Sequence, residues 1–182
     1  MILVISTCKY KLHELEFVKP VEDVLKETKK PYVIRHYTQL NKNNIDKADK
    51  IIICGTSLQD FNYVEKINKF SWINNINKPV LGICAGMQIL GLVYNGINKK
   101  KTEVGFYKEK FNKNFLNIKE NTEIEVYHLH NNYIDFLKLN EFETYCKSNG
   151  IAQAVKHKQK PLFGVLFHPE VRNKEIILNF VR

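Results

Sequence analysis

Short, strongly apolar runs alternate with amphipathic segments along the first half of the chain, and this alternation limits the folds open to it. We predict strands at the apolar runs, which are residues 2–5, 32–36, 51–53 and 80–83. We predict helices between and after these runs, at residues 14–26 and 62–70 and from residue 85 onward. Because parallel strands need long crossover connections, the pattern is typical of a mostly parallel sheet covered by helices.

The second half of the chain has a different pattern. Asn95-Gly96 marks a turn, and from there the sequence predicts strands with short connections up to an apolar strand at residues 163–167. Residues 175–181 predict a short closing helix. No repeat, linker or low-complexity segment is present, so we predict a single α/β domain over residues 1–182 with a β-rich second half.

Several classes of protein do not fit this sequence. No apolar stretch approaches the roughly 18 residues of a membrane span, so we expect no contact with a membrane. Residues 1–5 are typical of an opening strand and not of a signal peptide. The 4 cysteines lack CxxC spacing, which predicts neither a disulfide framework nor a zinc site and favours a cytoplasmic protein.

The formal net charge of +9 raises the question of nucleic acid. The lysines are spread along the chain, the tightest run is Lys99-Lys100-Lys101, and no nucleic-acid-binding motif accompanies them. We therefore expect a solvated basic surface and no nucleic-acid partner, although the charge would favour contact with an acidic protein.

The most informative segment is Gly82-Ile83-Cys84-Ala85-Gly86-Met87-Gln88. It has the form G-x-C-x-G between a buried strand and a helix, which is the context of a nucleophile elbow. Glycines on both sides of Cys84 let the neighbouring backbone approach, and the helix N-terminus favours a thiolate. The N–H of Ala85 would point to where an oxyanion forms. The alternative is a small buried cysteine in a tight joint between strand and helix.

A thiol nucleophile needs a base, and the base needs a group that orients it. His168-Pro169-Glu170 supplies both directly after an apolar strand. Because Pro169 fixes the backbone, the two side chains project from a rigid joint. A lone histidine after a strand is usually a surface residue, but the combination with the Cys84 elbow predicts a Cys-His-Glu triad of Cys84, His168 and Glu170.

These segments resemble the class I (triad-type) glutamine amidotransferases. Residues 82–88 resemble the G-x-C-x-G-x-Q elbow of that family, and residues 153–170 resemble its C-terminal signature. Glu103-Val104-Gly105 is similar to a Glu-Tyr-Gly segment between them. Within the family, the segments resemble the stand-alone amidotransferase subunit of GMP synthase and, less strongly, the anthranilate synthase subunit. The resemblance implies a flavodoxin-like fold and no cofactor.

The resemblance also implies a reaction. Cys84 would attack the side-chain amide of L-glutamine, His168 would protonate the departing ammonia, and Glu170 would hold the imidazole. A glutamyl thioester would form, and water activated by His168 would release glutamate. We expect the ammonia to pass to a separate synthase subunit, since 182 residues leave no room for a second catalytic domain.

Substrate-binding roles follow from the same resemblance for Gly55, Ala85, Gln88, His130, Asn131 and Asn132. The first two would donate backbone N–H groups to the oxyanion. Gln88, one helical turn beyond the elbow, would hold the amino-acid end of glutamine. His130 would precede a backbone stretch at Asn131 and Asn132 that contacts the substrate.

The sequence departs from the family pattern in three segments. The loop after the third strand is Cys54-Gly55-Thr56-Ser57 where a Gly-Gly-Pro-like sequence is usual, so one glycine remains for the oxyanion hole. Leu166 stands where a glutamine is usual, and residues 127–132 copy no subfamily, which leaves the partner enzyme open. Cys54 either packs as a small apolar residue or joins Cys84 in a reversible disulfide.

Three functions are compatible with these motifs: a glutaminase subunit of a synthase, a stand-alone hydrolase of γ-glutamyl compounds, and a non-enzymatic regulator. The intact triad motif argues against the regulator, and Gln88 favours free glutamine. His128 and His130 alternate along a strand and could form a metal site with His168. No further ligand is apparent, so we predict no metal.

Overall fold

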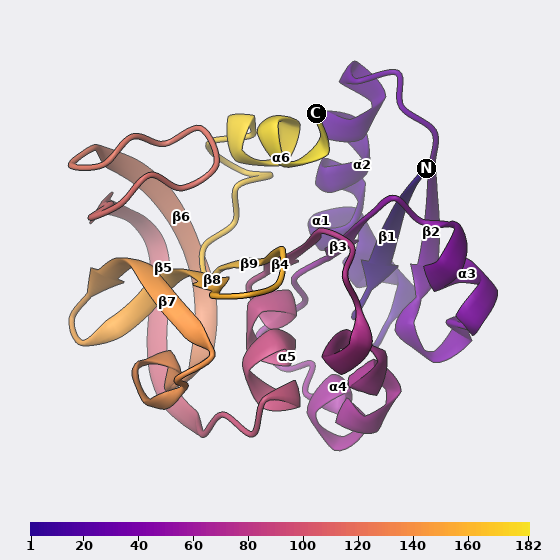
Figure 1. Ribbon diagram of the computed structural model, residues 1–182, viewed down its shortest axis with the longest axis horizontal. Helices are drawn as coiled ribbons and strands as arrows, with labels where there is room; N and C mark the ends of the chain where they lie inside the picture. Colours follow the sequence, from indigo (N-terminus) through magenta and orange to yellow (C-terminus); the bar gives the residue numbers. More distant parts are fainter.

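The computed structural model describes residues 1–182, and its elements follow the alternation seen in the sequence (Figure 1). The strands are β1 (Ile2–Ser6), β2 (Tyr32–His36), β3 (Lys50–Ile53), β4 (Val80–Ile83), β5 (Asn98–Lys110), β6 (Glu123–Ile134), β7 (Phe142–Ser148), β8 (Ile151–His157) and β9 (Leu162–Val165). The α-helices are α1 (Glu14–Phe17), α2 (Lys19–Glu27), α3 (Lys42–Lys47), α4 (Asn62–Glu65), α5 (Ala85–Val93) and α6 (Glu175–Val181).

Seven strands form one sheet in the order β2-β1-β3-β4-β9-β8-β7. The first five of these are parallel to one another, whereas β8 and β7 extend the sheet in antiparallel fashion. The parallel part has the strand order of flavodoxin-like folds, which confirms the predicted fold class. The carboxyl ends of β3, β4 and β9 lie side by side, at the edge where open α/β sheets bind their ligands.

Alternate side chains of the parallel strands pack into two separate cores, as strand geometry requires. In β1, Ile2 and Val4 belong to one core, whereas Leu3 and Ile5 belong to the other. The first core also contains the buried residues of α1, α2 and α6, and the second contains those of α4 and α5. Figure 1 shows α2 and α6 on one side of the sheet and α4 and α5 on the other, so helices cover both faces as predicted.

The β-rich second half is built around a long antiparallel ribbon of β5 and β6 (Figure 1). The pairing runs from Asn98 opposite Ile134 to Lys110 opposite Glu123. A register shift after Lys100 brings Glu103 opposite His130. β5 packs against β7, so the ribbon continues the core past the end of the main sheet.

The structure differs from the predicted elements in its helices. The predicted helix at residues 14–26 is divided at Val18, and Pro20 lies in the first turn of α2, where its missing N–H needs no partner. The helix predicted at residues 62–70 continues after α4 as a 3₁₀ helix over Ile67–Asn75. Helix α3 was not predicted, and Asn41 caps it. None of the helices is long and apolar enough to cross a membrane.

Candidate active site

Cys84 lies between β4 and α5 in a backbone conformation that side chains rarely adopt. Its φ is 49° and its ψ is −102°, so strain is concentrated at this residue. Its N–H donates to the carbonyl of Val165 on β9 at 2.8 Å, and its carbonyl accepts from the N–H of Gln88 at 3.0 Å. The sheet and the helix therefore hold the Cys84 side chain at the carboxyl edge of the sheet, in the predicted elbow.

The elbow can be this tight because Gly82 and Gly86 have no side chains. A Cβ atom at Gly86 would collide with the carbonyl oxygen of Ile53 on β3, and one at Gly82 would lie 2.5 Å from the backbone of Gly86. Helix α5 thus packs directly on the strands that carry it. A larger residue at either position would push the helix, and Cys84 with it, away from the sheet.

His168 and Glu170 follow β9 and are buried, with exposed fractions of 1% and 9%. The Nδ1 atom of His168 lies 2.7 Å from Oε1 of Glu170, and the backbone N–H of His168 donates to the carbonyl of Tyr127 on β6 at 2.8 Å. The other ring nitrogen, Nε2, has no hydrogen-bond partner in the protein. An imidazole held by a carboxylate on one side and free on the other can act as a general acid or base.

The side chains of Cys84 and His168 meet beside Gly55, in the loop after β3. A Cβ atom on Gly55 would lie 2.7 Å from Cε1 of His168 and 3.4 Å from Cβ of Cys84. Burial alone would lower the pKa of His168, but the Glu170 carboxylate and the Cys84 sulfur outweigh it and hold that pKa well above its ordinary value. The surroundings of His168 therefore favour its imidazolium form, with the Cys84 side chain beside it.

Like Cys84, the other cysteines are free and buried. Burial raises the pKa of the thiols of Cys8, Cys54 and Cys146. These thiols stay protonated at neutral pH and are poor nucleophiles. Cys54 is fully buried in the same core as Ile52 and Leu81, which agrees with the interpretation of Cys54 as a packing residue.

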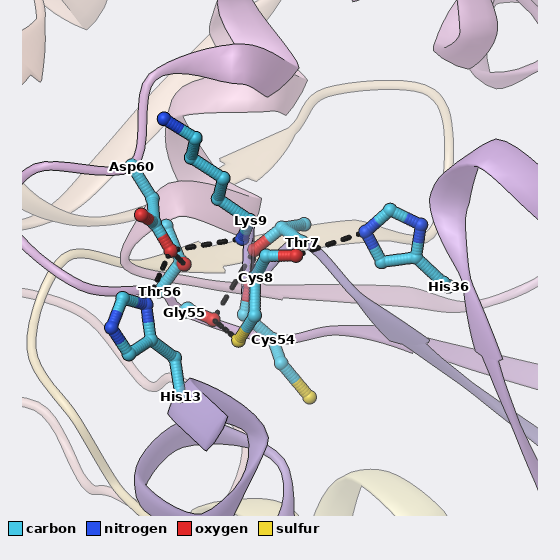
Figure 2. Close-up of polar contacts among 9 residues, drawn as sticks. All are labelled: Thr7, Cys8, Lys9, His13, His36, Cys54, Gly55, Thr56 and Asp60. Atoms are coloured by element: carbon cyan, nitrogen blue, oxygen red, sulfur yellow. Dashed lines mark hydrogen bonds and ion pairs between the residues drawn. The ribbon is translucent and has the colours of Figure 1, made fainter. Parts of the chain in front are cut away.

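Thr7, just after β1, fixes the orientation of the loop after β3 (Figure 2). Its Oγ1 donates to the carbonyls of Cys54 and Gly55 at 3.1 and 3.2 Å. In a trans peptide the carbonyl and the following N–H point in opposite directions. The N–H of Gly55 therefore points away from Thr7, as an oxyanion donor on the other side of the loop would require.

Asp60 ties the same loop to the segment that follows β1. Its carboxylate accepts hydrogen bonds from the Thr56 hydroxyl at 2.8 Å and the Lys9 N–H at 2.9 Å, and it faces Nδ1 of His13 at 2.8 Å (Figure 2). Burial raises the pKa of Asp60, but these partners together bring it below its ordinary value. No sequence motif pointed to Thr7 or Asp60, because their contacts depend on two loops that lie far apart in the sequence.

A small pocket lies above Cys84, and most of the predicted substrate-binding residues line it: Ala85, Gln88, His130, Asn131 and Asn132. Gly55 lies beside the pocket, against Cys84 and His168. The cavity volume is only about 20 Å³, which is room for about one water molecule. A ligand larger than water can therefore enter only if the lining moves.

Hydrogen bonds between the lining residues hold the pocket in this narrow form. The Asn131 side-chain amide donates to the carbonyl of Leu58 in the loop after β3 at 2.9 Å. The Gln88 side chain donates to the carbonyl of Asn132 at 2.9 Å and accepts from the Tyr63 hydroxyl at 2.5 Å. Tyr63 is a further candidate substrate residue, and the sequence held no signal for it because the tyrosine comes from α4 and not from a motif.

His130 borders the pocket, but its ring also faces a buried polar group on β5. Its Nε2 lies 3.1 Å from Oε2 of Glu103, and burial lowers the pKa of His130 although this contact opposes the shift. His128, on the same face of β6, lies next to it. The residue that joins these histidines in a group of possible metal ligands is Glu103, and not His168, with which we considered a metal site from the sequence before predicting none.

The sequence has relatives among GMP synthases. One subunit of the glutamine-hydrolysing GMP synthase of Methanococcus aeolicus is 35% identical over 116 residues, which are 59% of this chain and 61% of the relative. The corresponding subunit from Thermoplasma volcanium is 30% identical over 152 residues, 78% of this chain and 74% of the relative. The GMP synthase of Mesoplasma florum is 32% identical over 121 residues, but this chain spans only 23% of its length.

Solved structures show the same fold. A protein from Thermoplasma acidophilum that is named as a GMP synthase subunit has a TM-score of 0.84 and 25% identity, over 99% of this chain and 91% of that chain. A glutamine amidotransferase from Thermotoga maritima has a TM-score of 0.72 and 15% identity, over 99% and 80%. The profile of the family Glutamine amidotransferase class-I matches residues 14–180. The chain belongs to the class I glutamine amidotransferase family.

Proposed function

We propose that the chain hydrolyses L-glutamine to glutamate and ammonia through a glutamyl thioester on Cys84. The observation that carries this proposal is the meeting of Cys84 and His168 beside Gly55, with His168 paired to Glu170 at 2.7 Å. The raised pKa of His168 favours its imidazolium form. We propose that Cys84 attacks as a thiolate beside this imidazolium.

The reaction has two halves. The Cys84 thiolate attacks the amide carbon of glutamine, and the resulting oxyanion accepts hydrogen bonds from the N–H groups of Gly55 and Ala85. The His168 imidazolium gives its proton to the nitrogen, and ammonia leaves. Water then gives a proton to His168 and attacks the thioester carbon, which releases glutamate and restores the thiolate. Glu170 orients the imidazole throughout.

Specificity for free glutamine follows from the narrow pocket. Gln88 and Tyr63 form a buried polar pair one helical turn from Cys84, suited to the charged amino-acid end of glutamine. The Asn131–Leu58 hydrogen bond must open for even this small substrate. A γ-glutamyl peptide, which is bulkier at the scissile amide, needs a wider opening.

The ammonia would be used by a separate synthase subunit. The relatives named as subunits of GMP synthase suggest a synthase that makes GMP, and we propose a two-subunit enzyme of this kind. A reducing cytoplasm would keep Cys84 as a thiol.

Glutamate release separates this proposal from the alternative of a γ-glutamyl hydrolase. We expect wild-type chain to release glutamate from glutamine faster than from γ-glutamyl dipeptides, and Cys84→Ala to release it from neither. Cys8→Ala is the matched control and should retain activity. A preference for the dipeptides would favour the stand-alone hydrolase, and activity in Cys84→Ala would exclude the thioester.

A further inference from the structure

Beneath the β5–β6 ribbon lies a buried polar cluster that glutamine hydrolysis does not use in full. It consists of Glu103 and Glu109 from β5 and His128 and His130 from β6, all at most 3% exposed. Gln153 on β8 completes it, with its side-chain amide donating to Oε2 of Glu103 at 3.1 Å. The cluster thus joins the ribbon to the main sheet.

The cluster has two buried carboxylates and no lysine or arginine partner. Among ionisable partners, Glu103 faces His130, whereas Glu109 faces His128 and accepts from the Cys146 thiol at 3.5 Å. The ring of Tyr107 lies 5.1 Å and that of Phe167 6.2 Å from the ring of His128, so the surroundings are largely apolar. A buried carboxyl group avoids an uncompensated charge by taking up a proton, by facing an imidazolium or by binding a cation.

Unpartnered atoms are concentrated in the same place. Nδ1 of His128, both ring nitrogens of His130 and Oε1 of Gln153 are buried without a hydrogen-bond partner. His128 has its Nε2 on the Glu109 carboxylate at 3.3 Å, which leaves Nδ1 with a free lone pair. A carboxylate on one ring nitrogen and an open second nitrogen is the usual setting of a metal-binding histidine.

One distance in this group approaches the spacing of zinc ligands. Glu103, His128 and His130 each offer a ligand atom, and these atoms all lie within 4.8 Å of one another. Tetrahedral zinc with metal–ligand bonds of about 2.0–2.2 Å places its ligand atoms roughly 3.3–3.6 Å apart. Oε2 of Glu103 and Nε2 of His130 are 3.1 Å apart without an aligned hydrogen bond, close to that spacing.

We propose that Glu103, His128 and His130 bind a divalent transition-metal ion of the zinc class. The Glu109 carboxylate would orient the His128 ring through its contact with Nε2. Two imidazoles and one carboxylate are a common ligand set for zinc. The role is structural, because the cluster is closed off from solvent. The strand residues beside these ligands, Tyr127 and Leu129, give their carbonyls to the His168 N–H and the Cys84 thiol, so the ion would stiffen one wall of the active site.

The first experiment measures metal binding by the intact chain without glutamine. Chain stripped with a chelator is titrated with Co²⁺, which shows visible d–d absorption in tetrahedral sites, and zinc content is measured after reconstitution. We expect one ion per chain, release of Co²⁺ by Zn²⁺, and a higher melting temperature with metal. No saturable binding in wild-type chain would overturn the proposal and leave an imidazolium or a buried water as the occupant.

Variants locate the ion. His128→Leu keeps the side-chain volume and removes a ligand, and we expect it to lose the Co²⁺ spectrum. Glu109→Gln should bind about 10–100-fold more weakly, as loss of a supporting carboxylate typically does. His157→Asn, at a buried histidine elsewhere on β8, is the matched control and should bind like wild type. Equal binding by His128→Leu and wild type would place the ion elsewhere and overturn the proposal. Because no arm uses glutamine, failure here leaves the proposed hydrolysis untouched.

Discussion

At the residue scale, Cys84 is defined by its backbone as much as by its thiol. A φ of 49° forces the side chain out of the joint between β4 and α5, where helix N–H groups and the His168 ring surround it. Cys54 has the same thiol, but it is fully buried and its pKa is raised. Position, rather than residue type, therefore makes Cys84 the candidate nucleophile.

Substitution of His168 and Glu170 should separate proton transfer from orientation. We expect His168→Ala to slow glutamate release by about 10²–10⁴-fold, the usual contribution of acid–base help. Glu170→Ala should cost less, because the carboxylate positions the ring and does not carry the proton. Steady-state kinetics on folded variants measures both, with circular dichroism as the control for folding. A larger loss in Glu170→Ala would require other roles for the pair.

Titration of the His168 ring tests the electrostatics directly. We expect NMR to report a His168 pKa above the ordinary value of about 6.5 in wild type. In Glu170→Gln we expect a lower pKa, because the carboxylate charge that counteracts the effect of burial is gone. Because folding raises the pKa of His168, protonation of this ring adds to the free energy of unfolding. The contribution is complete below about pH 6.5 and is lost as the pH rises through the folded-state pKa. The difference in unfolding free energy between the two proteins should shrink with rising pH. A difference that grows would contradict the raised pKa.

At the scale of elements, β6 is the strand on which the site depends most. Three backbone carbonyls of β6 accept hydrogen bonds from the site. The carbonyl of Tyr127 accepts from the His168 N–H, that of Leu129 from the Cys84 thiol, and that of Asn132 from the Gln88 side chain. The loop after β3 forms the opposite wall, held by Thr7 and by Asp60. The two walls are joined by a single side-chain bond, from Asn131 to Leu58.

Removal of that bond should open the pocket. We expect Asn131→Ala to lower the KM for glutamine several-fold with little change in kcat, because the substrate no longer has to break the Asn131–Leu58 contact. Asn112→Ala, at an exposed asparagine outside the pocket, is the control. A raised KM would show instead that the Asn131 side chain itself binds glutamine.

Much of this arrangement could be predicted from sequence, and the reasons differ by element. The strand at residues 80–83 was predicted with its observed bounds because an uninterrupted apolar run is a strong signal, and the strand at residues 32–36 was predicted directly after Pro31. The triad motif was visible because its residues lie in two short segments. The Asp60 network was not visible, since it depends on contacts between segments distant in sequence. The division at Val18 was missed although Pro20 is a local signal for the start of a helix.

The polar cluster under β6 shows the same limit. Alternation placed His128 and His130 on one face, but only the register of β5 against β6 brings Glu103 opposite His130. That register includes a shift after Lys100, which no pattern in the sequence announces. From the sequence we therefore considered only His168 as a third member and predicted no metal, whereas the structure places Glu103 beside the two histidines.

At the scale of the whole molecule, the site lies at the carboxyl edge of the sheet with its pocket nearly closed. We expect the isolated chain to be a slow glutaminase, because the loop after β3 and Asn131 must separate before glutamine binds. Addition of the ammonia-using synthase subunit should raise kcat/KM for glutamine, as coupled ammonia release requires. Steady-state rates with and without that subunit measure this. Full activity of the purified chain alone would favour a stand-alone hydrolase.

The most direct test of the central claim is to trap the nucleophile. A glutamine-like electrophile, such as a diazoketone or chloroketone analogue, is incubated with the chain, and the labelled peptide is identified by mass spectrometry. We predict one label per chain, on Cys84, with loss of glutamate release in proportion and protection by excess glutamine. Labelling of Cys8 or Cys146, or full hydrolysis by chain labelled at Cys84, would contradict the account.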